Sequence, residues 1–185
     1  MITIRTERPV DTPARESLLD LAYGAERHAK PSARMRKGRK PAGGLSFVAL
    51  ERGKMLGTVR LWHVNAGRGR PALLLGPLAV HPEHRNRGIG SMLMQRAVSE
   101  AARLGHGAVL LVGDAAYYGR FGFSAEKTHT LHLAGADPTR LLARELTPDA
   151  LTGARGSVTA SGERERVLPS LRLTKPRARL VPRAA

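Results

Sequence analysis

The sequence contains no cysteine, and aromatic residues make up only 4% of its 185 positions. Without cysteine the chain has no disulfide framework, no thiolate metal site and no sulfur nucleophile, so covalent catalysis through sulfur is excluded. Hydrophobic residues nevertheless make up 42% of the chain, which is too many for a disordered protein. The length suits a single domain, and the scarcity of aromatic side chains predicts a mostly aliphatic core.

Long hydrophobic runs are also missing. The longest, Ala72 to Val80, is interrupted by Gly76 and Pro77, and it is far shorter than the roughly 20 residues that a membrane-spanning helix needs. Residues 1–8 alternate polar and apolar side chains and lack the basic and apolar regions of a signal peptide. We therefore expect no membrane association and a cytoplasmic location.

Acidic residues are scarce, with 15 Asp and Glu against 31 Lys and Arg, giving a net charge of +16. Residues 28–40 hold six Lys and Arg and no acid, and residues 153–185 hold eight against two acids. Such clusters attract nucleic acid. Neither segment contains an aromatic residue to stack on bases, so nucleic-acid binding is disfavoured.

The hydrophobic pattern predicts one α/β domain over residues 1–152, in which strands alternate with helices. We expect strands at 2–8, 45–50, 55–64, 72–80, 108–112, 128–133 and 141–146, and helices at 12–23 and 89–104. Residues 28–40 are expected as a basic loop or irregular helix, and residues 114–120 as a turn or short helix. Residues 153–185 contain scattered Gly and Pro and are predicted as a basic, flexible C-terminal tail with one short strand at 167–173.

Both predicted helices have an apolar face. In the first, Thr12 and Pro13 supply an N-terminal cap and first-turn proline, and Leu18, Leu19 and Leu21 are expected to be buried. In the second, the apolar positions recur at helical spacing. These are Ile89, Met92, Leu93, Ala97, Ala101 and Leu104.

The clearest chemical signal is Arg85-x-x-Gly88-x-Gly90, between a buried strand and the second helix. A helix N-terminus presents unpaired N–H groups and a positive dipole end, which together bind anions. Glycines let the backbone approach a phosphate, and Arg85 and Arg87 add positive charge. The spacing fits neither the P-loop nor the dinucleotide-binding fingerprint.

Residues 73–93, Leu-Leu-Leu-Gly-Pro-Leu-Ala-Val-His-Pro-Glu-His-Arg-Asn-Arg-Gly-Ile-Gly-Ser-Met-Leu, closely resemble the acetyl-CoA-binding motif of the GNAT family of N-acetyltransferases. Tyr118-x-x-x-Gly122-Phe123 resembles the family's second motif, which follows the fifth strand. The resemblance extends over most of residues 1–150 and is greatest to bacterial members of the YhbS type, whose acceptors are mostly undefined. It implies the GNAT acyl-CoA N-acyltransferase fold, an α/β fold with a splayed central mixed sheet flanked by helices.

The resemblance also implies where the cofactor lies. Gly76-Pro77 predicts a bulge, or alternatively a plain edge-strand kink, and a bulge would free nearby backbone groups to bind pantetheine as an added strand. The pyrophosphate would lie on the amides that open the second helix. The cofactor-binding residues are then Leu78, Ala79, Val80, Arg85, Arg87, Gly88, Ile89, Gly90 and Ser91.

By the same resemblance Tyr118 is the catalytic acid that protonates the departing thiolate, although aromatic packing with Phe121 and Phe123 is the alternative. A backbone N–H near Leu78 would bind the oxyanion. The strand at 72–80 has no ionisable side chain to act as base. Candidates elsewhere are Glu51, His63, His81 and Glu83, and a water-mediated base or an already neutral amine fits equally.

Two His pairs, His81 with His84 and His129 with His132, have i,i+3 spacing. Neither has a helix or a carboxylate partner in the predicted structure, so no metal site is expected. In the family the region after the first helix walls the acceptor site, which here is Lys30 to Lys40. Either these basic side chains point to solvent, or the acceptor carries compensating negative charge.

The sequence therefore predicts an enzyme that transfers an acetyl group from acetyl-CoA to a primary amine, on a small molecule or peptide, by direct attack in a ternary complex. A non-catalytic acyl-CoA-binding protein is the alternative from another class, followed by a basic nucleic-acid-associated protein. The acceptor, the general base, the acyl-chain preference and the oligomeric state are not determined, and a homodimer stays open.

Overall fold

The computed structural model describes residues 1–165, which form a mixed sheet with helices on both faces. The sheet has the order β1-β2-β3-β4-β5-β7, and β8 joins it through β3 and pairs with β6. The strands are β1 (Ile2–Thr6), β2 (Ser46–Glu51), β3 (Lys54–Ala66), β4 (Pro71–Val80), β5 (Ala108–Val112), β6 (Leu131–His132), β7 (Leu141–Glu145) and β8 (Gly156–Ala160). The predicted α/β fold with a mixed sheet is confirmed.

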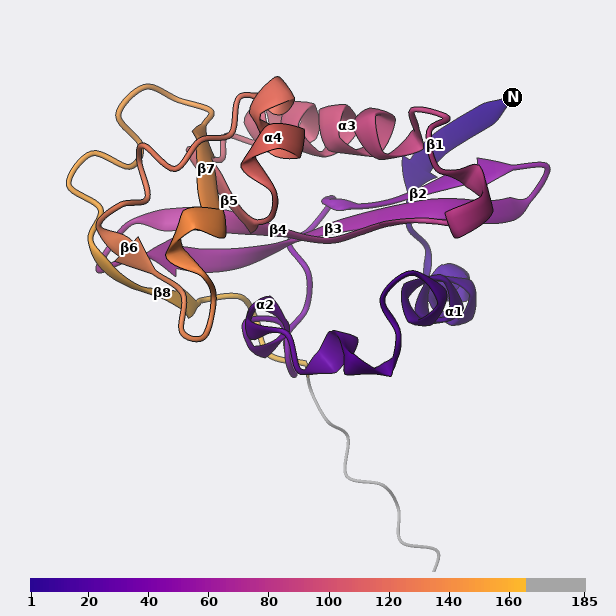
Figure 1. Cartoon of the computed structure of the whole chain (residues 1–185), viewed down its shortest axis with the longest axis horizontal. Helices are drawn as coiled ribbons and strands as arrows, with labels where there is room; N and C mark the ends of the chain where they lie inside the picture. Colours follow the sequence, from indigo (N-terminus) through magenta and orange to yellow (C-terminus); the bar gives the residue numbers. More distant parts are fainter. Residues whose placement is uncertain (166–185) are drawn as a thin grey trace, which may run out of the picture.

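The helices lie in two layers, with α3 and α4 on one face of the sheet and α1 and α2 on the other (Figure 1). The α-helices are α1 (Thr12–Tyr23), α2 (Pro31–Arg34), α3 (Ile89–Arg103) and α4 (Ala115–Tyr118), and the 3-10 turns are η1 (Pro9–Asp11), η2 (Ala25–His28), η3 (Pro82–His84), η4 (Gly119–Phe121) and η5 (Pro138–Arg140). The prediction for residues 12–23 is confirmed over its full length.

The sheet is splayed at the parallel junction between β4 and β5. Strands β4 and β5 pair only at Leu73 with Val109 and Leu74 with Leu110. Beyond these pairs β4 continues along β3 as far as Val80, and β5 ends at Val112. The remaining half of β4 therefore has a free edge, as predicted, and a cleft opens beside it.

A bulge in β4 marks the start of the splayed half. Arg60 of β3 lies opposite both Gly76 and Pro77, between the pairs Leu61 with Leu75 and Val59 with Leu78. The indole Nε1–H of buried Trp62 donates to the Gly76 carbonyl at 2.7 Å. The bulge predicted at Gly76-Pro77 is confirmed, because two residues of β4 lie opposite one residue of β3.

The largest part of the core lies between α3 and the sheet, and a smaller cluster of Leu18, Leu19 and Ala79 joins α1 to β4. Three predicted core residues are instead exposed: Leu21 at 55%, Met92 at 38% and Leu104 at 41%. Leu21 and Met92 lie at the margins of the apolar stripes of their helices, where one helical step turns the side chain away from the sheet. Leu104 is exposed because α3 ends at Arg103 and Leu104 is its C-cap residue.

Two further predictions differ from the structure. Residues 128–133 form a turn with only Leu131–His132 extended, because the Thr128 hydroxyl bonds back to the Leu141 carbonyl at 2.6 Å. Residues 156–160, expected in a flexible tail, form β8, which pairs with Val64–Ala66 of β3 and buries Val158. Residues 166–185 of the predicted tail, including the strand expected at 167–173, lie outside the described residues.

Within residues 1–165, no helix is both long and apolar enough to cross a bilayer.

Candidate active site

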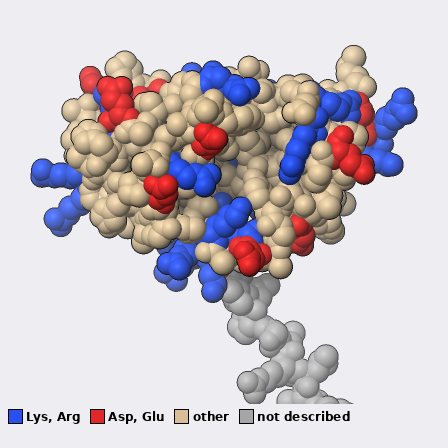
Figure 2. All heavy atoms as spheres, viewed as in Figure 1, with Lys and Arg blue, Asp and Glu red and all other residues tan. Residues whose placement is uncertain are grey.

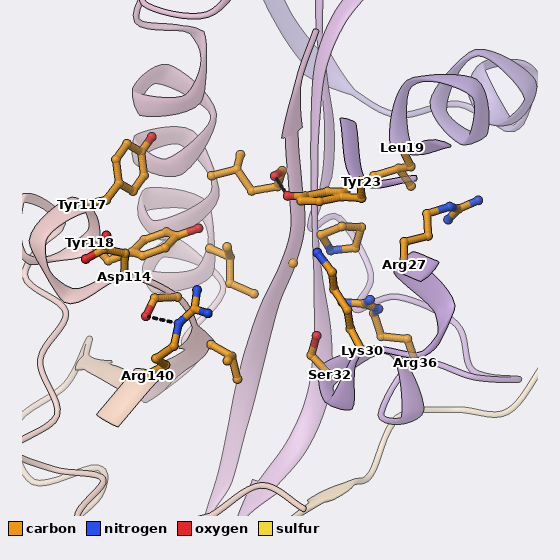
Figure 3. A pocket seen from close by; sticks show the side chains of 16 residues that line it. Leu19, Tyr23, Arg27, Lys30, Ser32, Arg36, Asp114, Tyr117, Tyr118 and Arg140 are labelled. Atoms are coloured by element: carbon orange, nitrogen blue, oxygen red, sulfur yellow. Dashed lines mark hydrogen bonds between the residues drawn. The ribbon is translucent and has the colours of Figure 1, made fainter. Parts of the chain in front are cut away.

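A cavity of about 370 Å³ occupies the cleft where β4 and β5 separate. One wall comes from the end of β5, α4 and η5, and the opposite wall from α1, η2 and the α2 region (Figure 3). Its lining residues come from segments far apart in the sequence: Leu19, Tyr23, Arg27, Lys30, Ser32, Arg36, Leu75, Gly76, Pro77, Leu78, Val112, Gly113, Asp114, Tyr117, Tyr118 and Arg140. The bulge and the predicted acid, Tyr118, therefore share one cavity.

Tyr118 ends α4 with its side chain partly buried, and its hydroxyl points across the cavity toward β4 (Figure 3). Burial raises the pKa of this hydroxyl well above its usual range, and the nearby Tyr23 and Tyr117 add to the shift. The ring lies directly over Gly113, where an added Cβ would come within 2.1 Å of the Tyr118 Cε2 atom. A protonated hydroxyl held rigidly in a cleft is suited to donate a proton.

Tyr117 points differently from its neighbour, with its hydroxyl directed away from the cavity floor (Figure 3). A Cβ added at Gly90, at the start of α3, would lie 2.8 Å from this hydroxyl. Its ring packs edge-on against Tyr118 with centroids 4.9 Å apart. Of the two adjacent tyrosines, Tyr118 is therefore the one whose hydroxyl enters the cleft beside the bulge.

Tyr23, the last residue of α1, approaches the bulge from the opposite wall. Its hydroxyl donates to the Leu78 carbonyl (Figure 3), and the Lys30 ammonium lies 4.2 Å from the centre of its ring. The bulge was predicted to free the backbone groups around Leu78. In the structure its carbonyl is already engaged, by a residue that sequence reasoning did not select.

The predicted phosphate loop forms a second cavity of about 380 Å³. Gly88 caps α3 in the left-handed conformation with φ 74°, and within the described residues the amides of Ile89, Gly90 and Ser91 have no backbone acceptor. These N–H groups and the helix dipole form an anion-binding site. The cavity is lined by Val80, His84, Arg85, Asn86, Gly88, Ile89, Gly90, Ser91, Tyr117 and Arg120.

Two of the predicted cofactor residues lie outside both cavities. Arg87 instead pairs with Glu51 at 2.8 Å, at the tip of the β2–β3 hairpin. Ala79 is buried against α1, so only its backbone could contribute. Arg120, which the sequence analysis did not select, lines the loop cavity and stacks on Tyr117 at 4.8 Å.

None of the four base candidates lines the cleft cavity. The Arg87 guanidinium beside Glu51 lowers the pKa of that carboxyl, which makes it a weaker base. His63 packs against His106 with ring centroids 5.5 Å apart, and the His81 ring accepts the Glu83 backbone N–H. Asp114 is the one carboxylate among the described lining residues, and its Oδ1 atom caps α4 by accepting from Ala116 N at 2.8 Å.

His81, Glu83 and His84 bring potential metal-ligating atoms within 4.8 Å of one another. The prediction that this His pair lacks a carboxylate partner is therefore wrong, because Glu83 supplies one. Both Nδ1 atoms are already engaged, that of His81 by Glu83 N and that of His84 by Arg87 at 3.0 Å. The nearby Arg87 charge also opposes a cation, so these residues fit a divalent ion poorly.

Part of the basic segment faces the cleft, because Lys30, Ser32 and Arg36 line the cavity. Figure 2 shows Lys and Arg gathered at the lower edge of the molecule, over η2 and α2. Sequence reasoning left open whether this segment faces solvent or the acceptor. Both arrangements occur in the structure: Lys30 and Arg36 line the cavity, whereas Arg34 and Lys37 are exposed and absent from the lining.

The sequence and the fold match known proteins. The family model described as "Acetyltransferase (GNAT) domain" matches residues 42–125. The Escherichia coli K12 protein described as "Uncharacterized N-acetyltransferase YhbS" is 29% identical over 157 residues, which cover 84% of this chain and 93% of YhbS.

Two crystal structures extend the comparison. E. coli YhbS in complex with CoA superposes with a TM-score of 0.73 and 29% identity, covering 86% of this chain and 89% of YhbS. A GNAT family acetyltransferase from Brucella melitensis in complex with acetyl-CoA gives a TM-score of 0.65 and 26% identity, covering 87% and 96%. The resemblance to GNAT acetyltransferases that the two sequence motifs predicted is confirmed by the match of the family model, the similarity to YhbS and the superposition on both structures.

Proposed function

We propose that this protein transfers an acetyl group from acetyl-CoA to a primary amine by direct attack within a ternary complex. The observation that carries this proposal is the cleft between β4 and β5, where the Tyr118 hydroxyl points toward the free edge of β4 beside the bulge. The similarity to structures that contain CoA and acetyl-CoA supports the identity of the donor. A cytoplasmic location stays a prediction from the sequence.

The donor would bind along the splayed half of β4. Its pyrophosphate fits the unpaired amides of Ile89, Gly90 and Ser91, and Arg85 and Arg120 line the same cavity. Its pantetheine arm would extend along the free edge of β4 toward Leu78, as an added strand. The Arg87 guanidinium would bind the donor only after its ion pair with Glu51 breaks, so of the predicted cofactor-binding residues it has the least structural support.

In the chemical step the amine nitrogen attacks the thioester carbon, and the carbon–sulfur bond breaks. The oxyanion would be held by a backbone N–H near Leu78. Tyr118 gives its proton to the departing sulfur and regains one from water, while the amine loses its proton to water. Asp114, on the same wall as Tyr118, is placed to hold the incoming amine.

The test replaces Tyr118 with Phe and measures thiol release from acetyl-CoA with a broad panel of amines. Loss of a general acid lowers turnover by about 10² to 10⁴-fold, and we expect the dissociation constant for CoA, from calorimetry, to stay within about threefold. The matched variant Tyr117→Phe removes a hydroxyl directed toward Gly90, so it should affect donor binding more than turnover. Wild-type turnover in Tyr118→Phe would remove Tyr118 from its role.

A non-catalytic acyl-CoA-binding protein is the second candidate, favoured by the absence of the four base candidates from the cleft lining. It predicts CoA binding without thiol release from any amine. Replacing Gly90 with Val should abolish CoA binding under either function, since even a Cβ would meet the Tyr117 hydroxyl. A nucleic-acid-associated protein would instead be unaffected by that substitution.

A further inference from the structure

The cleft cavity contains more cations than its proposed reaction requires. Four basic side chains line it, Arg27, Lys30, Arg36 and Arg140, against the single carboxylate of Asp114. An amine acceptor is itself cationic in water at neutral pH and would be repelled by such a wall. The excess positive charge therefore favours an acceptor that carries a second, anionic group.

We propose that the acceptor is a small amine that also carries an anionic group, a carboxylate or a phosphate, and that Arg36 binds this group. The inference rests on the proposed function, because it names the substrate class of the same site. It is carried by the position and the unpaired state of the Arg36 guanidinium.

Arg36 differs from the other arginine on its side of the cavity. Arg27 is neutralised by Glu16 at 2.5 Å and by Asp20 at 2.6 Å. The Arg36 guanidinium has no ion pair or hydrogen bond to any residue within 1–165, although its side chain is half-buried. Burial lowers its pKa to about 10. A partly desolvated cation without a partner is unfavourable, and a bound anion would restore the lost interaction.

The position of Arg36 limits the size of the acceptor. Its Nη1 atom lies 3.8 Å from the point that a Cβ on Gly76 would occupy. Gly76 precedes Leu78, the proposed oxyanion site, by two residues, which is about 7 Å along a strand. The anionic group must therefore lie only a few bonds from the reacting amine, as it does in an α-amino acid or a phosphorylated aminoalcohol.

The other wall complements this arrangement. Asp114 and Tyr118 lie together across the cavity from Arg36 (Figure 3). The ammonium end of the acceptor would meet Asp114 beside the acid, while its anionic end meets Arg36, with Lys30 on the same wall. Polyamines and aminoglycosides, which carry several positive charges and no anion, fit this cavity poorly. A peptide N-terminus also has no anion at this distance.

The experiment compares acceptors that differ only in the anion. Thiol release from acetyl-CoA is measured with α-amino acids against their amides, and with phosphoethanolamine against ethanolamine. We expect kcat/KM to be at least tenfold higher for the anionic member of one of these pairs, and the pair that shows it identifies the anion. The amide is a demanding control, because its amine is the less basic and is more often neutral at pH 7.

Three variants assign the effect to Arg36. The preference for the anionic acceptor should fall at least tenfold in Arg36→Gln, through KM rather than kcat, and should be partly kept in Arg36→Lys. The matched control Arg34→Gln removes an exposed arginine two residues before Arg36, at the end of α2, that does not line the cavity, and it should leave both pairs unchanged.

Three results would overturn the inference while the proposed function stands. The first is equal or better turnover of the amides and of ethanolamine, and the second is an unchanged preference in Arg36→Gln. The third is weaker CoA binding in that variant, which would assign Arg36 to the donor. If CoA binds but no amine releases thiol, the proposed function fails. The inference is then decided by calorimetry on the CoA-saturated protein with N-acetylated amino acids against their amides. Equal affinity for both would overturn it.

Discussion

At the scale of single residues, the site depends on a glycine that the reaction never touches. The Tyr118 ring occupies the space that a side chain at Gly113 would need, so one methyl group there must move the proposed acid. Gly113 is buried between the end of β5 and the Asp114 cap of α4, which leaves the ring little room to shift elsewhere.

We predict that Gly113→Ala lowers kcat by at least tenfold, because the Tyr118 hydroxyl is displaced from the bulge, while CoA affinity changes little. Steady-state thiol release and calorimetry measure the two quantities. Gly119→Ala is the matched control, since a Cβ there meets nothing within 4 Å and the backbone is helical. Equal kcat values for Gly113→Ala and the wild type would show that the close packing under Tyr118 is not required.

Tyr118 was predictable because its motif is local, with Gly122 and Phe123 within five residues. Tyr23, Arg36 and Asp114 were not selected, since each acquires its place through contacts with distant segments. The Tyr23 bond to Leu78 joins residues 55 positions apart. The signal that was available is small: Tyr23 is the only tyrosine that is not in or next to the second motif.

At the scale of elements, the entry into α1 depends on an ion pair that the sequence pattern did not indicate. Asp11, and not Thr12, precedes the helix as its N-cap residue, and its carboxylate accepts from both Arg5 guanidinium nitrogens, at 2.7 and 2.8 Å. It also accepts from Arg8 N at 2.7 Å. These bonds join β1 to the start of α1, the helix that carries Tyr23 into the cleft.

Asp11→Asn should lower the free energy of unfolding by on the order of 1–3 kcal/mol at pH 7. The hydrogen bonds from Arg5 hold the Asp11 pKa far below its usual value. Because the folded pKa is below the unfolded one, the stabilisation is complete above about pH 4 and is lost as the pH falls toward the folded pKa. The difference between variant and wild type should therefore shrink between pH 4 and pH 2.

Urea unfolding at pH 7, 4, 3 and 2 tests this dependence. Glu26→Gln is the control, because Glu26 is exposed on η2 and forms no ion pair within the described part of the chain. It should change stability little at any pH. A difference for Asp11→Asn that stays constant from pH 7 to pH 2 would contradict the proposed ionic contribution.

At the scale of the whole molecule, residues 153–165 hold the basic wall of the cleft in place. Strand β8 pairs with the end of β3, and the following residues contact the loop after α2. The Lys40 ammonium pairs with Glu163 at 2.6 Å, and the Glu165 amide donates to the Gly38 carbonyl at 3.0 Å. The segment that follows Arg36 is thus anchored by residues more than 120 positions away.

We predict that a chain ending at residue 152 is less stable than one ending at residue 165 by at least about 2 kcal/mol, the value of burying a side chain such as Val158. The shorter chain should also have a higher KM for its amine acceptor, with a smaller change for acetyl-CoA. Urea unfolding and thiol-release kinetics on the two truncations measure these effects. Equal urea midpoints for the two chains would show that residues 153–165 do not stabilise the fold, in agreement with the flexible tail that the sequence predicted.

The sequence by itself determined the resemblance to GNAT acetyltransferases, the order of the main strands and helices, the bulge at Gly76-Pro77 and the choice of Tyr118 as the candidate acid. These features depend on residues close together in the chain, whose periodicity and spacing reflect local backbone geometry. Only the tertiary structure decided that Tyr23 reaches Leu78, that Arg36 faces the cleft unpaired, and that β8 belongs to the sheet. Those outcomes depend on which distant segments come into contact. The physical reason is that side-chain packing and charge pairing across a sheet are set by the completed fold and not by any local sequence pattern.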